Sequence, residues 1–375
     1  MKIFNLPGTK ILRSVDYNMI FTKWKDPATQ IPDGNLIRWG KTPEDDPTFS
    51  PFGGEIADIE ISAGKCPGIR RADGKMIGCS FCYKGNSPNQ PLENMSLATF
   101  KIVLDKLLDQ SPLTQVALGL TGVKDNPDLI PIMRYCREKE VFPNFTLTGA
   151  DLDFETAEQL SELCGGLAVS CSETNPDLCF DTVKLFTDLG VEQVNIHIVV
   201  SKESVPFVFE VLKARETDPR LKDMRAIVLL AIKPKGRATN NFHTASSKQY
   251  QEIIDYALLR NIPLGFDSCS CAHFLNSVSH RPDYKAIESM TDSCESTLFS
   301  VYINVKGQFF PCSFAEGTLG WEKGLDVITC NDFIQDIWLN PRTVEFREKL
   351  IASANNKLNC RQCPLYPELH IKGLH

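Results

Sequence analysis

Three cysteines with the spacing of metal ligands follow a short apolar run near residue 60. They are Cys66, Cys79 and Cys82, and the last two form a Cys-x2-Cys pair. Such pairs bind zinc or iron–sulfur clusters. Three thiolates from one loop would leave one iron of a [4Fe–4S] cluster without a protein ligand, and an open iron is what a reacting ligand needs. The alternative is that Cys66 is an ordinary cysteine and that another residue completes the site.

A second group of cysteines lies in the last third of the chain, and its members are Cys294, Cys312, Cys360 and Cys363. The aromatic run 298–305 and the run 308–310 flank Gly307, which predicts a hairpin that brings Cys294 and Cys312 side by side. A closed set of four thiolates would hold a cluster that conducts electrons or shapes the site. Four thiolates suit a structural zinc ion equally well.

The compartment follows from cysteine usage and from the start of the chain. There are 14 cysteines in 375 residues, and Met1–Gly8 has no apolar run of signal-peptide length. The longest apolar stretch, Ala226–Ile232, is too short to span a bilayer. We therefore expect a protein of the reducing cytoplasm, where clustered cysteines bind metal more often than they form disulfides.

The elements that must position these cysteines alternate along the chain. Strand-like runs are predicted at 56–62, 115–122, 144–148, 167–170, 194–200 and 225–232. Helix-like stretches are predicted at 96–108, 127–140, 154–163, 176–189 and 205–215, with a further helix at 247–259. This rhythm predicts βα units and a parallel sheet, open or curled into a barrel, whose active site gathers at the carboxyl ends of the strands.

The two ends of the chain lack this rhythm. Residues 1–50 mix short apolar pieces with Pro, Gly and Asp and are predicted to be an N-terminal arm. The alternating core takes residues 51–264, and residues 265–375 are predicted to be a separate cysteine-rich module. The length of 375 residues suits such a division.

At the first cysteine loop the sequence resembles the radical S-adenosylmethionine (SAM) superfamily. Its usual loop is Cys-x3-Cys-x-aromatic-Cys after the first strand, and Cys79-Ser80-Phe81-Cys82 matches the second half. The first spacing departs, because twelve residues, Pro67 to Gly78, separate Cys66 from Cys79. The resemblance implies a partial (β/α)6 barrel. It also implies a [4Fe–4S] cluster that binds SAM, cleaves it to a 5′-deoxyadenosyl radical and so initiates hydrogen abstraction from a substrate.

Further pieces follow in the family's order and imply which residues bind SAM. The place of the family's Gly-Gly-Glu-Pro is taken by Gly119-Leu120-Thr121-Gly122, which lacks the Glu, so the backbone of Gly119 and Gly122 or the side chain of Thr121 would accept the SAM ammonium. A tight strand-to-helix turn explains the same residues. The resemblance places Phe81 and the strand ends beside the adenine; Ser170 is expected there, as is His197, for which a buried core histidine is the alternative.

The last part of the chain resembles the auxiliary-cluster modules called SPASM and twitch, with twitch the better match because one Cys-x2-Cys pair follows. The resemblance implies an auxiliary [4Fe–4S] cluster held by the second cysteine group, a small α+β module and a net oxidation or modification of the substrate. Cys269 and Cys271 lie at the junction of barrel and module. There they are catalytic candidates, as thiol donors or an extra ligand, and structural burial is the alternative.

The substrate class stays open at this level, with a peptide, a protein and a small molecule as candidates. The resemblance implies an electron donor such as flavodoxin or ferredoxin. The 40 basic and 47 acidic residues give a net charge of -7, so we expect neither nucleic acid nor membrane as a partner. Two other classes remain, namely a non-catalytic iron–sulfur electron carrier and a zinc-stabilised binding protein.

Overall fold

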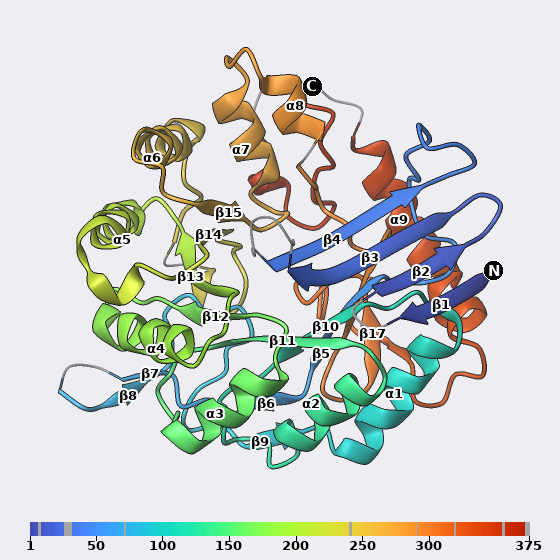
Figure 1. Cartoon of the computed structure of the whole chain (residues 1–375), viewed down its shortest axis with the longest axis horizontal. Coiled ribbons are helices and arrows are strands. Elements are labelled where there is room, and N and C mark those ends of the chain that lie inside the picture. Colours follow the sequence, from blue (N-terminus) through green and yellow to red (C-terminus); the bar gives the residue numbers. More distant parts are fainter. Residues whose placement is uncertain are drawn as a thin grey trace.

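A computed structural model describes residues 1–375 except 7–8, 26–31, 71–72, 240–241, 290, 319, 355–356 and 372–375. Its centre is one long sheet whose strands curl around a cavity (Figure 1). In spatial order the strands are β15 (Leu264–Phe266), β14 (Ala226–Ala231), β13 (Val194–Val200), β12 (Leu167–Ser170), β11 (Phe142–Leu147), β10 (Gln115–Gly119), β5 (Ile56–Glu60), β16 (Ser300–Ile303), β17 (Gln308–Phe310) and β18 (Leu325–Asp326). All pairs from β15 to β16 are parallel.

Helices cover the outside of the six predicted barrel strands (Figure 1). They are α1 (Leu97–Gln110), α2 (Leu129–Glu138), α3 (Phe154–Leu163), α4 (Pro176–Asp188), α5 (Val205–Thr217) and α6 (Ser247–Leu259). The predicted α/β fold with a partial barrel is confirmed, and four predicted elements, β12, β13, α3 and α6, have the predicted bounds. No helix among the described residues is long and apolar enough to cross a membrane.

Local chemistry explains why these elements form where they do. Along β13 buried and half-buried residues alternate, so that Ile196 and Ile198 face the helices while Asn195 and His197 face the cavity. The helix α4 begins at Asn175, whose side chain accepts a hydrogen bond from the backbone N–H of Leu178. The strand β13 is therefore buried on its outer face, and its polar residues lie on the cavity face.

Strands of the predicted C-terminal module join the barrel sheet. The strand β16 pairs in parallel with the first barrel strand, β5, and β17 and β18 continue the sheet by antiparallel pairing. The predicted boundary near residue 265 falls within β15, at the opposite edge. The helices α7 (Cys271–Val278), α8 (Tyr284–Ser289) and α9 (Pro341–Ala352) complete this part of the chain. The last third of the chain thus extends the barrel at both edges of one sheet.

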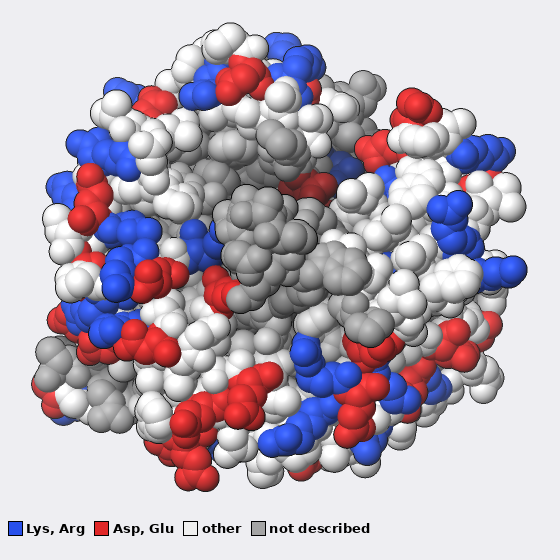
Figure 2. Space-filling view, viewed as in Figure 1, with Lys and Arg blue, Asp and Glu red and all other residues white. Residues whose placement is uncertain are grey.

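The N-terminal arm, for which no strands were predicted, is a four-stranded antiparallel sheet. Its strands are β1 (Lys2–Leu6), β2 (Thr9–Arg13), β3 (Asn18–Lys25) and β4 (Pro32–Trp39). One face packs Leu12 and Met19 against Phe346 and Leu350 of α9. The other face is open and mostly uncharged (Figure 2), with Phe4 48% exposed. Only one face is buried, so the apolar signal in the sequence was weak.

An ion-pair network fixes this sheet to the barrel. The Arg38 guanidinium lies 2.9 Å from a carboxylate oxygen of Glu55, whose side chain is fully buried, and 3.1 Å from Glu295. Burial and then the charges of Glu295 and Asp292 raise the pKa of Glu55 well above its ordinary value. The Arg38 guanidinium is the positive charge that opposes this effect at the junction.

We expect the substitution Arg38→Met to lower the free energy of unfolding by about 3–5 kcal/mol, because it leaves a buried carboxylate without its partner. The double variant Arg38→Met/Glu55→Gln should recover part of this loss, since residue 55 then carries no charge. Denaturant unfolding measures both values. Lys41→Met is the control, because Lys41 pairs with Asp16 at the surface, and its effect should stay below about 1 kcal/mol. An equal effect of Arg38→Met and Lys41→Met would contradict the role of Arg38.

Candidate functional site

The three cysteines of the first loop are brought together by a hairpin that the sequence did not reveal. The inserted residues between Cys66 and Cys79 form β7 (Ile69–Arg70) and β8 (Met76–Ile77), which pair antiparallel. Gly68 opens this hairpin with a φ of 71°, and a Cβ there would lie 1.9 Å from the carbonyl oxygen of Ile77. The long first spacing therefore folds out of the way and returns the chain to the cavity.

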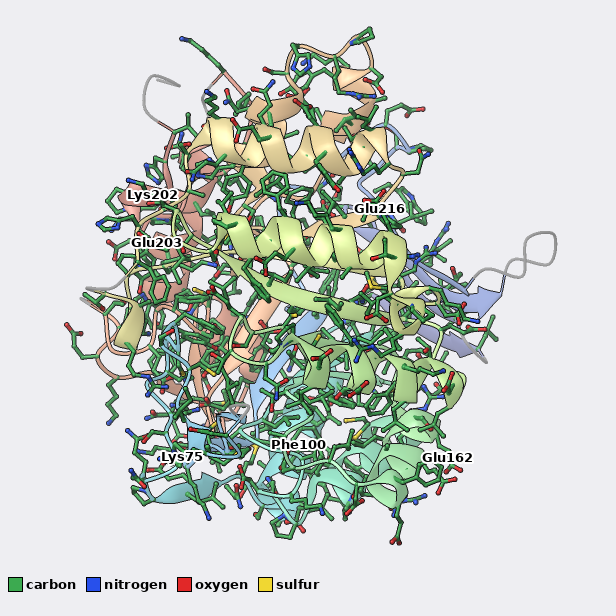
Figure 3. All side chains as sticks on the ribbon, turned by 90° about the vertical axis from the view of Figure 1, so that its left-hand side faces the viewer. Lys75, Phe100, Glu162, Lys202, Glu203 and Glu216 are labelled. Atoms are coloured by element: carbon green, nitrogen blue, oxygen red, sulfur yellow. The ribbon has the colours of Figure 1, made fainter. Side chains whose placement is uncertain are left out.

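The loop lies at the carboxyl ends of the barrel strands. Figure 3 shows Lys75, in the hairpin, on the same side of the molecule as Lys202 and Glu203, which follow β13, and opposite Glu162 and Glu216. This is the end of a parallel barrel at which chemistry is expected. The loop with the cysteines therefore lies at the carboxyl ends of the barrel strands in the structure, where the sequence predicts it.

Cys66, Cys79 and Cys82 all line one cavity of about 740 Å³ inside the barrel. Burial, and then the charges of Cys66 and Cys82, raise the pKa of the Cys79 thiol to about 12. Burial also raises the pKa of Cys66. Three thiols within mutual electrostatic reach suit a cation, because metal binding deprotonates thiols and removes their repulsion. Within the described ranges no three or more His, Cys, Asp or Glu side chains are spaced to hold a single metal ion.

Arg237 ties this loop to the end of β14. Its guanidinium donates to the carbonyl oxygens of Cys79 at 2.8 Å, Gly85 at 2.7 Å and Asn86 at 2.7 Å. Its backbone N–H donates to the carbonyl of Cys82 at 3.1 Å. The preceding Gly236 has a φ of 61°, and a Cβ there would lie 2.5 Å from that same Cys82 oxygen. The segment Gly236-Arg237-Ala238 is therefore a docking point for the cysteine loop.

The predicted SAM turn is already largely hydrogen-bonded within the protein. The carbonyl of Gly119 accepts from the Ile61 N–H at 2.7 Å, and that of Gly122 accepts from Asp125 at 3.2 Å. The Thr121 hydroxyl donates to an Asp125 carboxylate oxygen at 2.7 Å. Gly119 and Thr121 line the cavity, whereas Gly122 is buried and is absent from the cavity lining.

Two carboxylates that the sequence analysis missed stand beside this turn. A Cβ at Gly122 would lie 2.5 Å from the Asp151 carboxylate and 2.9 Å from that of Asp125. Both charges raise the pKa of Cys66. Burial raises the pKa of Asp151 itself, although the Lys124 N–H donates to it at 3.0 Å. Two carboxylates, from the loops after β10 and β11, thus lie close to this turn and to Cys66, although neither lines the cavity.

Phe81, Ser170 and His197 line the cavity, as predicted from their places in the chain. Ser170 and His197 are register partners on the neighbouring strands β12 and β13. The His197 ring nitrogen Nδ1 lies 3.4 Å from the Thr146 hydroxyl. Burial lowers the pKa of His197 to about 4. The ring is therefore neutral near pH 7 and can both donate and accept a hydrogen bond in the cavity.

Other charged residues of the cavity wall are paired across the barrel edge. Lys84 donates to Glu60 of β5 at 3.1 Å and to the Tyr302 hydroxyl of β16 at 2.7 Å, and it contacts Glu316. Burial lowers the pKa of Lys84, but the neighbouring negative groups outweigh this effect and raise it. Lys84, two residues after Cys82, thus links the cysteine loop to both strands of the β5–β16 pair.

Asp58, on β5, is different because it has no partner. Its side chain is accessible from within the cavity and yet enclosed by the protein, so desolvation raises its pKa to about 6. It makes no hydrogen bond in the part of the chain that the structure describes. An unpaired acid with a raised pKa inside a cavity is typical of a functional site. The alternation of residues along the strand could not distinguish it from an acid that faces solvent.

The second cysteine group is only partly brought together. Cys294, Cys312 and Cys363 interact electrostatically with one another. Cys269, a predicted catalytic residue, interacts with Cys294 and Cys363. Cys360 instead lies with its sulfur 3.4 Å from that of Cys271, the other predicted catalytic residue. The chain therefore holds Cys269 with the second group and separates Cys360 from it.

The sequence matches no protein-family model and no curated protein. The structure is similar to that of Streptococcus suis SuiB bound to precursor peptide SuiA, with a TM-score of 0.59 and 14% identity over 79% of this chain and 67% of that chain. It is also similar to native anSMEcpe with bound AdoMet and Cp18Cys peptide, with a TM-score of 0.60 and 13% identity over 85% of this chain and 92% of that chain. At such identities the likeness shows a shared fold.

The pKa of Asp58 predicts a pH-dependent stability. Because burial raises this pKa from 3.8 to about 6, the folded chain binds an extra proton between these values, and stability falls as the pH rises from about 4 to about 6. Asp58→Asn removes the titration. Relative to the parent, this variant should gain more stability at pH 7.5 than at pH 4.5 in denaturant unfolding. Asp153→Asn is the control, since hydrogen bonds from Lys124 and Thr156 lower the pKa of that exposed acid, which therefore stays ionised over this pH range. A pH-independent difference for Asp58→Asn would contradict the assignment.

Proposed function

We propose that this chain, whose fold is that of the radical SAM enzymes SuiB and anSMEcpe, is itself a radical SAM enzyme. Cys66, Cys79 and Cys82 would hold a [4Fe–4S] cluster with one iron left for SAM. When bound, the reduced cluster and SAM supply a 5′-deoxyadenosyl radical that takes a hydrogen atom from the substrate. The protein's task is to bind, orient and enclose the reactants.

The observation that carries this proposal is the geometry of the first cysteine loop. Three cysteines from one loop line a single cavity at the carboxyl ends of the barrel strands. The β7–β8 hairpin takes up the extra residues between Cys66 and Cys79. The loop therefore offers the three-thiol arrangement implied by the Cys79–Cys82 resemblance despite its unusual spacing.

The cavity wall supports SAM binding in the same place. Phe81 offers an aromatic face, and the neutral His197 and Ser170 offer hydrogen-bonding groups at the ends of β12 and β13. Gly119 lines the same cavity without a side chain. Thr121 would take the SAM ammonium with help from Asp125, whose carboxylate already accepts from the Thr121 hydroxyl. These groups replace the glutamate that the family's motif supplies.

The substrate that we propose is a peptide or protein side chain that undergoes oxidation or another modification. The structures of SuiB and anSMEcpe with similar folds were obtained with peptides. Beyond the cysteine loop the cavity of about 740 Å³ offers Asp58 and the pair Lys233–Asp267 as polar contacts. A small molecule is the competing substrate class. The proposed electron donor is a flavodoxin or ferredoxin, and the 14 cysteines, none of which forms a disulfide in the described structure, support the reducing cytoplasm as the site of action.

Anaerobic reconstitution with iron and sulfide, followed by dithionite and SAM, tests the proposal. We expect about eight irons per chain, as two [4Fe–4S] clusters require, together with formation of 5′-deoxyadenosine. Cys82→Ala should abolish deoxyadenosine, whereas Cys363→Ala should spare part of it. Cys164→Ala, at the end of α3, is the matched control and should keep both iron and activity. Clusters without SAM cleavage would indicate an electron carrier, and zinc alone would refute both.

The docking of the cysteine loop by Arg237 gives a separate prediction. Arg237→Ala removes the donor shared by the carbonyls of Cys79, Gly85 and Asn86, so the thiols lose their fixed positions. Loss of such a supporting contact typically weakens metal affinity about 10- to 100-fold. A chelator titration of the reconstituted protein measures this change. Arg225→Ala, at the exposed opposite end of the same strand region, should have no effect, and equal iron retention in the two variants would refute the docking role.

A further inference from the structure

The Cys-x2-Cys pair near the end of the chain divides between two environments. Cys360 is 2% exposed and packs in an apolar cluster with Cys271, Leu275 and Leu358. Its sulfur lies 3.4 Å from the Cys271 sulfur. Cys363 instead packs beside Cys269 against another apolar cluster. Two cysteines that are neighbours in a ligand-like pattern therefore point to different places.

The thiols that converge on Cys363 are those of other segments. One small cavity is lined by Cys269, Cys294 and Cys363 together. Cys312 belongs to the same group of thiols. Burial, and then the charges of Cys312 and Cys363, raise the pKa of Cys294. The thiol that the structure adds to the predicted set is Cys269, which follows β15 at the edge of the barrel.

Two cationic groups lie beside these thiols, namely Lys233 near Cys269 and Cys312, and Arg361 near Cys294; the Arg361 charge also acts on Cys271 and Cys360. The Lys233 side chain is 4% exposed and donates to the Asp267 carboxylate at 2.7 Å. It also forms a hydrogen bond with Cys269. The Arg361 guanidinium donates to the backbone carbonyl of Cys294 at 2.6 Å. An all-thiolate [4Fe–4S] cluster carries net negative charge, and nearby buried cations stabilise it.

We propose that Cys269, Cys294, Cys312 and Cys363 hold the auxiliary iron–sulfur cluster, and that Cys360 is not a ligand but forms a buried thiol pair with Cys271. This inference rests on the proposed radical SAM function only in taking the second site to be an iron–sulfur site. It removes Cys269 and Cys271 from the catalytic candidates and replaces one ligand that the sequence pattern predicts.

The backbone explains why adjacent thiols separate. Cys269 lies in the turn between β15 and α7, where the Ser270 N–H donates to Asp267, the partner of Lys233. Cys271 is the first residue of α7, so its side chain follows the helix and is buried on the far side of the turn. The same turn thus directs the thiol of Cys269 to Lys233 and that of Cys271 to the cluster with Leu275 and Leu358.

The test uses the full chain with Cys66, Cys79 and Cys82 all changed to Ala, so that bound iron reports the second site alone. After anaerobic reconstitution this parent should bind about four irons and sulfides and give the EPR signal of a reduced [4Fe–4S] cluster. Adding Cys269→Ala should remove this signal and most of the iron. Adding Cys360→Ala should leave both unchanged, and Cys271→Ala is its matched control.

The opposite pattern, with iron lost in Cys360→Ala and kept in Cys269→Ala, would overturn the ligand assignment. A parent that binds no iron would also overturn it, while 5′-deoxyadenosine formed by the unmutated chain would leave the proposed function intact. Far-UV circular dichroism verifies folding of each variant. Where Cys269→Ala unfolds, Cys269→Ser preserves the shape of the side chain and should still change the EPR signal, because a hydroxyl is a poorer iron ligand than a thiolate.

Discussion

The contact between Arg237 and the cysteine loop is the constraint on which the proposed site depends. The loop between Cys66 and Asn86 has little regular structure besides the short β7–β8 hairpin. A planar guanidinium can satisfy several carbonyls at fixed angles, and here it reaches three of them. Since Arg237 follows β14 and the loop follows β5, this one side chain couples the last barrel strand to the first across the cavity.

A second coupling joins the two cysteine groups through the sheet itself. The strand β16 lies beside β5, and Lys84 bridges Glu60 of β5 and Tyr302 of β16. Aromatic rings continue the contact, because Tyr83, next to Cys82, lies 4.3 Å from Phe314 between ring centroids, and Phe314 lies 6.3 Å from Tyr366. The first loop and the C-terminal segment therefore form one wall and cannot move independently without breaking buried pairs.

The sequence predicted those parts of the fold in which residue type follows burial directly. The barrel strands and helices alternate regularly, so elements such as Val194–Val200 were predicted with their bounds. The N-terminal sheet was missed because only one of its faces is buried. The position of Asp151 and the separation of Cys360 from Cys363 depend on which loops lie close together in the folded chain. A single sequence does not show these long-range contacts.

The interior of the barrel shows why these long-range contacts matter. A protein core normally pairs its buried polar groups, and leaving one unpaired costs stability. Lys233 and Lys84 obey this rule through Asp267 and Glu60, whereas the side chain of Asp58, which is exposed to the cavity, has no hydrogen-bond partner among the described residues. The unpaired acid lies in the same cavity as the three thiols of the first loop. Hydrogen bonds to a bound ligand would satisfy this carboxyl group. Ligand binding would therefore offset the free-energy cost of leaving it unpaired in the cavity.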